Sequence, residues 1–254
     1  MPYLDHDGLR LYYEVHGSRG DRPPLLLSHG YSATAEMWAP NVAALSADRQ
    51  VITWDIRGHG RSDAPPDLAR YTEELAVGDI AALLDRVGAD RAVIGGLSLG
   101  GYLALRFHLR HRERVVALVL CDTGPGYRRA EPRAEWNAMA ARRADQLDRE
   151  GLAALGGSAE VRAAHHRSAA GLALAARGIL TQHGPDVFES LPSVAVPTLV
   201  VVGADDKAFL AAADVLAAKV PGAVKVVIPD AGHAANIDQP DAFNRALLGF
   251  LDAL

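Results

Sequence analysis

The chain has 254 residues, 49% of them hydrophobic, and a formal net charge of −5 at pH 7. This size and composition suit one large α/β domain, and the negative charge argues against nucleic acid or an anionic membrane as the main partner. The single cysteine, Cys121, excludes an internal disulfide. We find neither a signal peptide nor an apolar run of about 18 residues that could span a membrane, so we expect a cytoplasmic protein.

The first 122 residues alternate between short apolar runs and helical patterns. Polar and apolar residues alternate around Asp7-Gly8, which predicts a hairpin over residues 3–16. Continuous apolar runs, typical of strands covered on both faces, follow at 24–28, 50–54, 93–97 and 115–121. Helical spacing lies between them, for example at 75–87. This order predicts right-handed βαβ crossovers and an α/β fold with a mostly parallel central sheet flanked by helices.

The alternation stops in the middle of the chain. No strand is predicted over 127–191. Trp136 and Met139 belong to an apolar stripe with helical spacing over 131–147, and an Ala-rich helical pattern covers 161–180. Ordinary crossovers are shorter than this segment, so we expect a helical cap over the carboxyl edge of the sheet.

Strands and helices resume after the cap. Two further strands are predicted over 197–202 and 224–228, and helices over 208–219 and from Pro240 to the end of the chain. The expected division is a core of residues 1–122 and 192–254 with the cap inserted at 123–191.

The central motif is Gly96-x-Ser98-x-Gly100, which follows an apolar run and precedes a helical pattern. Such a motif predicts a sharp turn that holds the serine in a strained backbone conformation at the end of a strand. The amino end of the next helix then favours negative charge that develops there. Ser98 is therefore a candidate nucleophile, whereas the motif alone is also compatible with a glycine-rich turn without chemistry.

Two more polar features follow predicted strands. Asp205-Asp206 comes after the strand at 197–202, and His233 comes after the strand at 224–228. Open parallel sheets place their sites at the carboxyl ends of strands. A serine hydroxyl needs an imidazole to accept its proton, and the imidazole needs a carboxylate to orient it. The pattern predicts a Ser-His-Asp triad whose acid is one of these aspartates, with Asp122 as a lesser alternative.

The motifs together resemble the α/β-hydrolase superfamily in its capped form. The matching segments are His29-Gly30, Asp55-x-Arg57-Gly58-x-Gly60-x-Ser62, Gly96-x-Ser98-x-Gly100, Gly203-x-x-Asp206 and Gly232-His233. In that family the acid stands three residues after the glycine that closes its strand, which implies Asp206 rather than Asp205. The resemblance also implies an oxyanion hole formed by the backbone N–H groups of Tyr31 and Leu99. Structural roles are implied for His29, Arg57 and His59.

The implied activity is hydrolysis of a carboxylic ester or lactone through an acyl-enzyme. We expect an apolar and aromatic substrate pocket lined by Tyr31, Leu97, Tyr127, Trp136, Met139 and Phe209. This set favours a medium-sized, largely uncharged small-molecule substrate. No metal-binding or nucleotide-binding motif is found, so we expect neither a metal nor a cofactor. The helical pattern places His165-His166 within a helix, in contact with solvent or the cap.

Other chemistries remain open on the same fold: a lyase, a carbon–carbon hydrolase or a cofactor-free perhydrolase. The segments around Asp206 and His233 are similar to those of menaquinone-pathway synthases, and Arg128 and Arg129 could bind a polycarboxylate. A catalytically silent receptor is a further alternative, but such proteins have usually lost a triad residue and this sequence retains all three. The sequence contains no signal for the oligomeric state.

Overall fold

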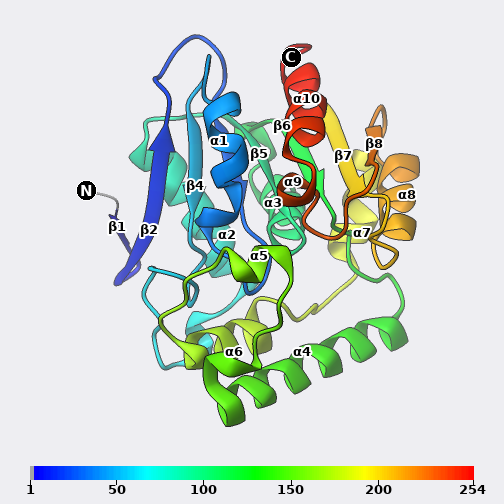
Figure 1. The fold of residues 1–254 in the computed structure, drawn as a ribbon. Helices are drawn as coiled ribbons and strands as arrows, with labels where there is room; N and C mark the ends of the chain where they lie inside the picture. The colour runs from blue at the N-terminus through cyan, green and yellow to red at the C-terminus, as the bar shows by residue number, and fades with distance from the viewer. Residues whose placement is uncertain (1–2) are drawn as a thin grey trace.

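The computed structural model describes residues 3–254; Met1 and Pro2, which begin the polar start of the chain, lie outside the described residues (Figure 1). Eight strands form one sheet in the order β1-β2-β4-β3-β5-β6-β7-β8. The strands are β1 (Tyr3–His6), β2 (Leu9–His16), β3 (Leu25–Ser28), β4 (Val51–Trp54), β5 (Ala92–Leu97), β6 (Val115–Cys121), β7 (Thr198–Gly203) and β8 (Val224–Ile228). The pairs β1–β2 and β2–β4 are antiparallel and all other pairs are parallel, which confirms the predicted sheet.

The antiparallel edge begins with the predicted hairpin. Asp7 and Gly8 connect β1 and β2, and both have positive φ, 51° and 71°. This is the backbone that a two-residue primed turn requires, and Asp-Gly is a preferred sequence for it.

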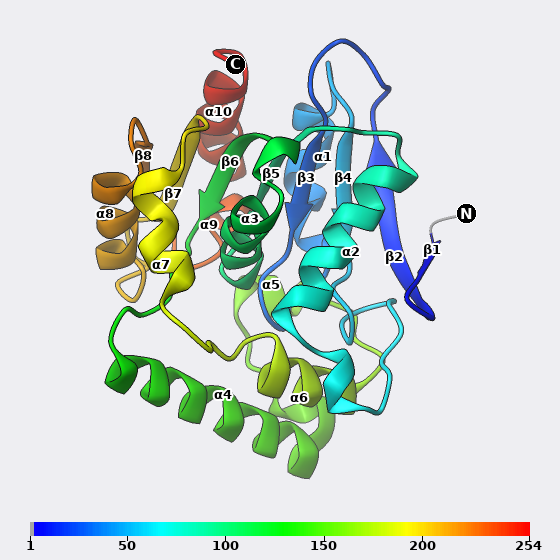
Figure 2. The ribbon, with the colours of Figure 1, turned by 180° about the vertical axis from the view of Figure 1, so that it is seen from behind.

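Helices cover both faces of the parallel part of the sheet (Figures 1 and 2). One face packs against α1 (Ala39–Leu45) and α10 (Pro240–Leu251), and the other against α2 (Glu73–Arg86), α3 (Leu99–Arg110) and α8 (Leu210–Lys219). Strands β3, β4 and β5 are buried along their whole length, which explains why they are apolar without alternation. Shorter helical segments complete the core: η1 (Ala35–Trp38), η2 (Leu68–Arg70), η3 (Arg112–Arg114) and α9 (Ala235–Asp238).

Local signals set the ends of several helices. Thr72 caps α2 by accepting a hydrogen bond from the Leu75 N–H at 3.1 Å, and acidic residues fill the first turn. The long helix α4 (Ala130–Glu150) ends at Gly151, whose φ is 64°. Helix α10 begins at Pro240, as predicted.

The segment between β6 and β7 is helical, as expected: α4, η4 (Gly151–Ala154), α5 (Ala159–Arg162), α6 (Ala169–Gly178), α7 (Asp186–Ser190) and η5 (Leu191–Ser193). Helices α4 and α6 pack against each other beyond one end of the sheet, whereas α7 contacts α3 on its flank (Figures 1 and 2). The exact division at 123 and 191 stays a prediction. Within residues 3–254, no helix combines the length and apolar character needed to cross a membrane.

One prediction in this segment is wrong. Residues 161–180 do not form one helix, because α5 ends at Arg162 and α6 begins only at Ala169. The hydroxyl of Ser168 accepts a hydrogen bond from the Gly171 N–H at 2.9 Å, which starts a new helix. His165 and His166 therefore lie in the connecting loop and not on a helix.

Candidate active site

Ser98 lies in the turn between β5 and α3, and its backbone has φ 54° and ψ −113°. Positive φ is strained for a residue other than glycine. The turn is possible because its neighbours lack side chains. A Cβ on Gly96 would lie 2.6 Å from the carbonyl carbon of Gly100, and a Cβ on Gly100 would lie 2.6 Å from that of Ser28. The glycines of the motif are thus required by backbone packing.

Hydrogen bonds hold the strained serine on both sides. The Ser98 N–H donates to the Cys121 carbonyl at 2.9 Å, and the Thr123 hydroxyl donates to the Ser98 carbonyl at 2.6 Å. Sequence reasoning missed Thr123, although a hydroxyl residue soon after a strand end is a visible signal. The bonds fix the backbone and leave the Ser98 side chain at a cavity.

The turn after β3 lies against this serine. A Cβ on Gly30 would lie 3.4 Å from the Cβ of Ser98. The next residue is Tyr31, and neither its backbone N–H nor that of Leu99 donates a hydrogen bond to any group in residues 3–254. Two free N–H groups on the segments that meet at Ser98 are what an oxyanion hole needs.

His29 supports this turn. Its Nδ1 donates to the Gly30 carbonyl at 2.7 Å, and its Nε2 accepts from the Ile56 N–H at 2.9 Å. Complete burial lowers the pKa of His29 to about 3. The ring is therefore neutral and occupied on both nitrogens, so it holds two loops together and is not available as a base.

Arg57 and His59, also expected to be structural, are fully buried in the loop after β4. The Arg57 guanidinium makes two bonds to the Asp79 carboxylate, at 2.7 and 2.8 Å. A bidentate pair of this kind fixes the loop by geometry as well as charge.

The acid and the histidine come from the loops after β7 and β8. The Nδ1 of His233 lies 2.7 Å from Oδ2 of Asp206. Asp206 is buried, whereas its neighbour Asp205 is exposed. The two loops meet because Gly203 has no side chain: its Cβ would lie 2.8 Å from the carbonyl carbon of Ala231.

The environment of His233 changes its pKa. Burial opposes the charged form, but the hydrogen bond and charge of Asp206 outweigh burial and raise the pKa above its usual value of 6.5. The charges of Asp122 and of Glu160 on helix α5 act in the same direction. The face of the ring stacks on Phe209, with centroids 4.9 Å apart.

Asp122, the lesser candidate for the acid, has a different partner. Its Oδ1 accepts a hydrogen bond from the Gly203 N–H at 2.8 Å. Burial, with a further contribution from the charge of Asp206, raises the pKa of Asp122 to about 8. Asp122 thus links β6 to β7, and the carboxylate that reaches the histidine is that of Asp206.

A cavity of about 440 Å³ opens beside Ser98, between the sheet edge and the helical segment that follows β6. Tyr127, Trp136 and Phe209, all expected in the pocket, line it. Sequence reasoning missed several lining residues: Pro125, Leu180, Gln182, Phe188, Ala212 and Val215. Half of these residues lie on α7 or α8 and half in loops, so only the fold brings them to one cavity.

Three expected pocket residues lie elsewhere. Leu97 is completely buried in the core cluster beneath α1 and α10, because alternate residues of β5 face opposite sides of the sheet. Met139 is partly buried and lies outside the cavity lining. The Tyr31 side chain also lies outside the lining, and its hydroxyl donates to the Leu172 carbonyl on α6 at 2.9 Å.

Two cations lie at the cavity as well. Arg128 and Arg129 are exposed and line it, and neither guanidinium has a carboxylate partner among residues 3–254. Arg133, one helical turn further on, instead donates to the carbonyl of Tyr127 at 3.0 Å. The wall is therefore mostly apolar, with positive charge at one place.

Comparison with known proteins shows the family. Residues 25–246 match the profile of the Alpha/beta hydrolase family. The crystal structure of the enol-lactonase from Burkholderia xenovorans LB400 superposes with a TM-score of 0.79 at 33% identity, covering 99% of this chain and 100% of that one. A thermophilic esterase from Thermogutta terrifontis, solved with malate bound, superposes with a TM-score of 0.83 at 30% identity, covering 99% and 97%.

A curated relative has a different kind of name. A Bacillus subtilis (strain 168) protein, provisionally named a 2-succinyl-6-hydroxy-2,4-cyclohexadiene-1-carboxylate synthase, is 28% identical over 98% of this chain and 97% of its own length. Similarity therefore extends to proteins with both hydrolase and synthase names.

Proposed function

Since the chain belongs to the alpha/beta hydrolase family, we propose that it is a serine hydrolase that cleaves a carboxylic ester or a lactone. The observation that carries this proposal is the hydrogen bond between Asp206 and His233. The His233 ring stacks on Phe209, which lines the same cavity as Ser98. This arrangement supports a site in which Ser98 is the nucleophile, His233 the base and Asp206 the acid.

The proposed reaction starts with the tautomer of His233. Because Nδ1 donates to Asp206, Nε2 is free to accept the proton of the Ser98 hydroxyl. The serine oxygen then attacks the carbonyl carbon, and the resulting oxyanion is bound by the N–H groups of Tyr31 and Leu99. The protonated His233 returns the proton to the leaving alcohol, which leaves an acyl-enzyme. Water, deprotonated by His233, releases the acid product and restores Ser98.

The cavity supports a medium-sized substrate. Its volume of about 440 Å³ and its mostly apolar lining suit an acyl or lactone group of several carbons. We propose that residues 123–191 form the cap that closes this cavity and selects the substrate, because Tyr127 and Trp136 line it from that segment.

The main test is a screen of esters, lactones and thioesters with Ser98→Ala as the blank. We expect Ser98→Ala to lower kcat by about 10⁴-fold or more, because the residues of a triad act as a unit. A fluorophosphonate should label Ser98 in the wild-type protein only. Ser193→Ala, at an exposed serine, is the matched control and should be fully active. Retention of a tenth of the activity in Ser98→Ala would contradict the covalent mechanism.

A second candidate is lyase chemistry on a polycarboxylate, with Ser98 as a base. It is favoured by Arg128 and Arg129, whose unpaired charges at the cavity suit an anionic group. The test compares a hemisuccinate ester with a neutral ester of equal length in the Arg128→Gln/Arg129→Gln variant. A rise in KM for the anionic ester alone would support an anionic substrate, and Arg112→Gln, at an exposed site outside the cavity lining, is the control.

A further inference from the structure

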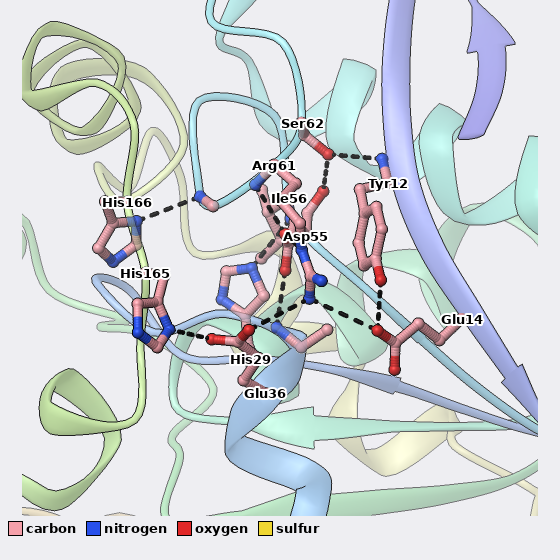
Figure 3. A network of polar contacts seen from close by, with 12 residues as sticks. Tyr12, Glu14, His29, Glu36, Asp55, Ile56, Arg61, Ser62, His165 and His166 are labelled. Atoms are coloured by element: carbon pink, nitrogen blue, oxygen red, sulfur yellow. Dashed lines mark hydrogen bonds and ion pairs between the residues drawn. The ribbon is translucent and has the colours of Figure 1, made fainter. Parts of the chain in front are cut away.

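The loop between α5 and α6 places His166 in hydrogen-bond contact with two loops of the core. Figure 3 shows its bond to the loop that contains Arg61. Its Nδ1 lies 3.1 Å from the Gly60 N–H, which donates to it, and its Nε2 lies 3.0 Å from the Ser32 carbonyl. Because Nδ1 accepts, the proton must be on Nε2, which donates to Ser32. Both bonds together require one neutral tautomer of His166.

The surroundings favour that neutral form. Burial lowers the pKa of His166, although the Ser32 carbonyl and the carboxylates of Asp55 and Glu36 act in the opposite direction. The ring also meets the His59 ring edge to face, with centroids 5.9 Å apart. His166 is therefore a packed, neutral bridge and not a surface cation.

Ser32 follows Tyr31 in the turn that faces Ser98. Its φ is 58°, a strained value for a serine, and its hydroxyl donates to the Tyr31 carbonyl at 2.7 Å. The turn is closed by the Ala33 N–H, which donates to the Gly30 carbonyl at 3.1 Å. A strained turn persists only where its surroundings hold it, and the bond from His166 to Ser32 is one such restraint.

The other bond of His166 reaches a rigid loop. The Asp55 carboxylate accepts the N–H groups of Ala35, at 2.7 Å, and Arg61, at 2.8 Å (Figure 3). Gly60 lies within this loop and has φ 49°. The Gly60 N–H thus holds the imidazole at one position, and the imidazole in turn holds Ser32.

We propose that His166 is a positioning residue that keeps the turn Gly30–Ala33 in the geometry in which the Tyr31 N–H binds the oxyanion, so that docking of the cap and assembly of the oxyanion hole are coupled. This proposal rests on the proposed function. A second link between the same two parts is the bond from the Tyr31 hydroxyl to Leu172 on α6.

The test compares His166→Ala, His166→Gln and His165→Ala with an ester that the wild-type protein hydrolyses. His166→Ala should lower kcat by about 10- to 100-fold with little change in KM, because a displaced oxyanion donor weakens transition-state binding more than substrate binding. His166→Gln, whose amide offers one acceptor and one donor, should restore most of kcat. His165→Ala removes the neighbouring exposed contact with Glu36 and should keep wild-type kcat.

Three results would overturn the proposal: equal kcat in His166→Ala and His165→Ala, a lower Tm in His166→Ala with unchanged kcat, or no recovery in His166→Gln. If the wild-type protein hydrolyses no ester or lactone, the proposed function fails by itself. Amide hydrogen exchange at Ala33 then still tests whether His166 holds the turn. Faster exchange in His166→Ala than in His165→Ala supports it, and equal exchange overturns it.

Discussion

The glycines around Ser98 and those of residues 151–157 have opposite surroundings. A Cβ on Gly96 or Gly100 would lie 2.6 Å from neighbouring backbone carbon atoms. A Cβ on Gly151, Gly156 or Gly157 would meet no atom within 4 Å. Backbone against backbone therefore sets the geometry of the turn that holds Ser98, whereas Gly151, Gly156 and Gly157 make no such contact. Gly171 on α6 resembles the glycines of the turn, because its Cβ would lie 2.8 Å from the Gly58 carbonyl oxygen.

Side-chain hydrogen bonds join α4 to residues 180–182. The Trp136 Nε1–H donates to the Leu180 carbonyl at 2.7 Å, and Asn137 exchanges two hydrogen bonds with the backbone of Gln182, at 2.8 and 2.9 Å. Side-chain contacts can change one at a time, whereas a backbone contact cannot. We therefore expect substitutions at the turn around Ser98 to disturb the backbone, and substitutions such as Trp136→Ala to remove single side-chain contacts.

The loop after β7 gives the largest expected effect, because substitutions at two adjacent aspartates should change kcat very differently. Asp206→Asn should lower kcat by about 10³- to 10⁴-fold, because an amide does not stabilise the protonated His233. Asp205→Asn should stay near wild type, since Asp205 is exposed. Steady-state kinetics on purified variants measure both effects. A severe loss of kcat in Asp205→Asn alone would show that Asp205, and not Asp206, is the acid.

The contrast between Gly100 and Gly156 can be tested by measuring the free energy of unfolding of alanine variants. Gly100→Ala should lower the free energy of unfolding by about 1–3 kcal/mol or more, because the new methyl group overlaps the backbone of Ser28. Gly156→Ala, which adds the same methyl group in open space, should be close to neutral. Urea unfolding gives both values, and the labelling rate of Ser98 by a fluorophosphonate should fall in Gly100→Ala alone. Equal stabilities would remove the basis of the comparison.

Trp136 tests whether the cap selects the substrate. Trp136→Ala should change the ratio of kcat/KM between octanoate and acetate esters by about tenfold, because the ring lines the cavity and lies 6.2 Å from the Tyr127 ring. Leu152→Ala, on the exposed surface of the cap, is the control. A constant ratio together with a lower Tm would make the ring a packing residue only.

The smallest effect concerns proton binding. An NMR titration should show His233 with a pKa above 6.5 and His29 neutral throughout the range from about pH 5 to 8, since burial lowers the pKa of His29 to about 3. Activity requires neutral His233, so kcat/KM should fall as the pH drops through its pKa. In Asp206→Asn the pKa of His233 should decrease, because its hydrogen-bond partner loses the charge. An unchanged pKa would contradict the role of Asp206.

Several features could be predicted because their cause is local. Asp7-Gly8 has the positive φ values of a hairpin turn. The glycines on both sides of Ser98 were recognised from the spacing of the motif, although the contacts that require them include Ser28 on β3. The continuous apolar runs identify the buried strands, since a parallel strand is covered on both faces. The order of strands and helices then predicted the mostly parallel sheet.

Other features depend on contacts between distant parts of the chain. Leu97 and Phe209 are similar as apolar residues near strand ends, yet one is buried under α1 and α10 and the other stacks on His233. The helical pattern over 161–180 did not reveal that a new helix starts after Ser168, or where the loop before it lies. Only the fold brings His166 to Ser32, 134 residues earlier. The periodicity of apolar residues predicts whether a residue is buried or exposed. Tertiary packing decides which partner that residue contacts.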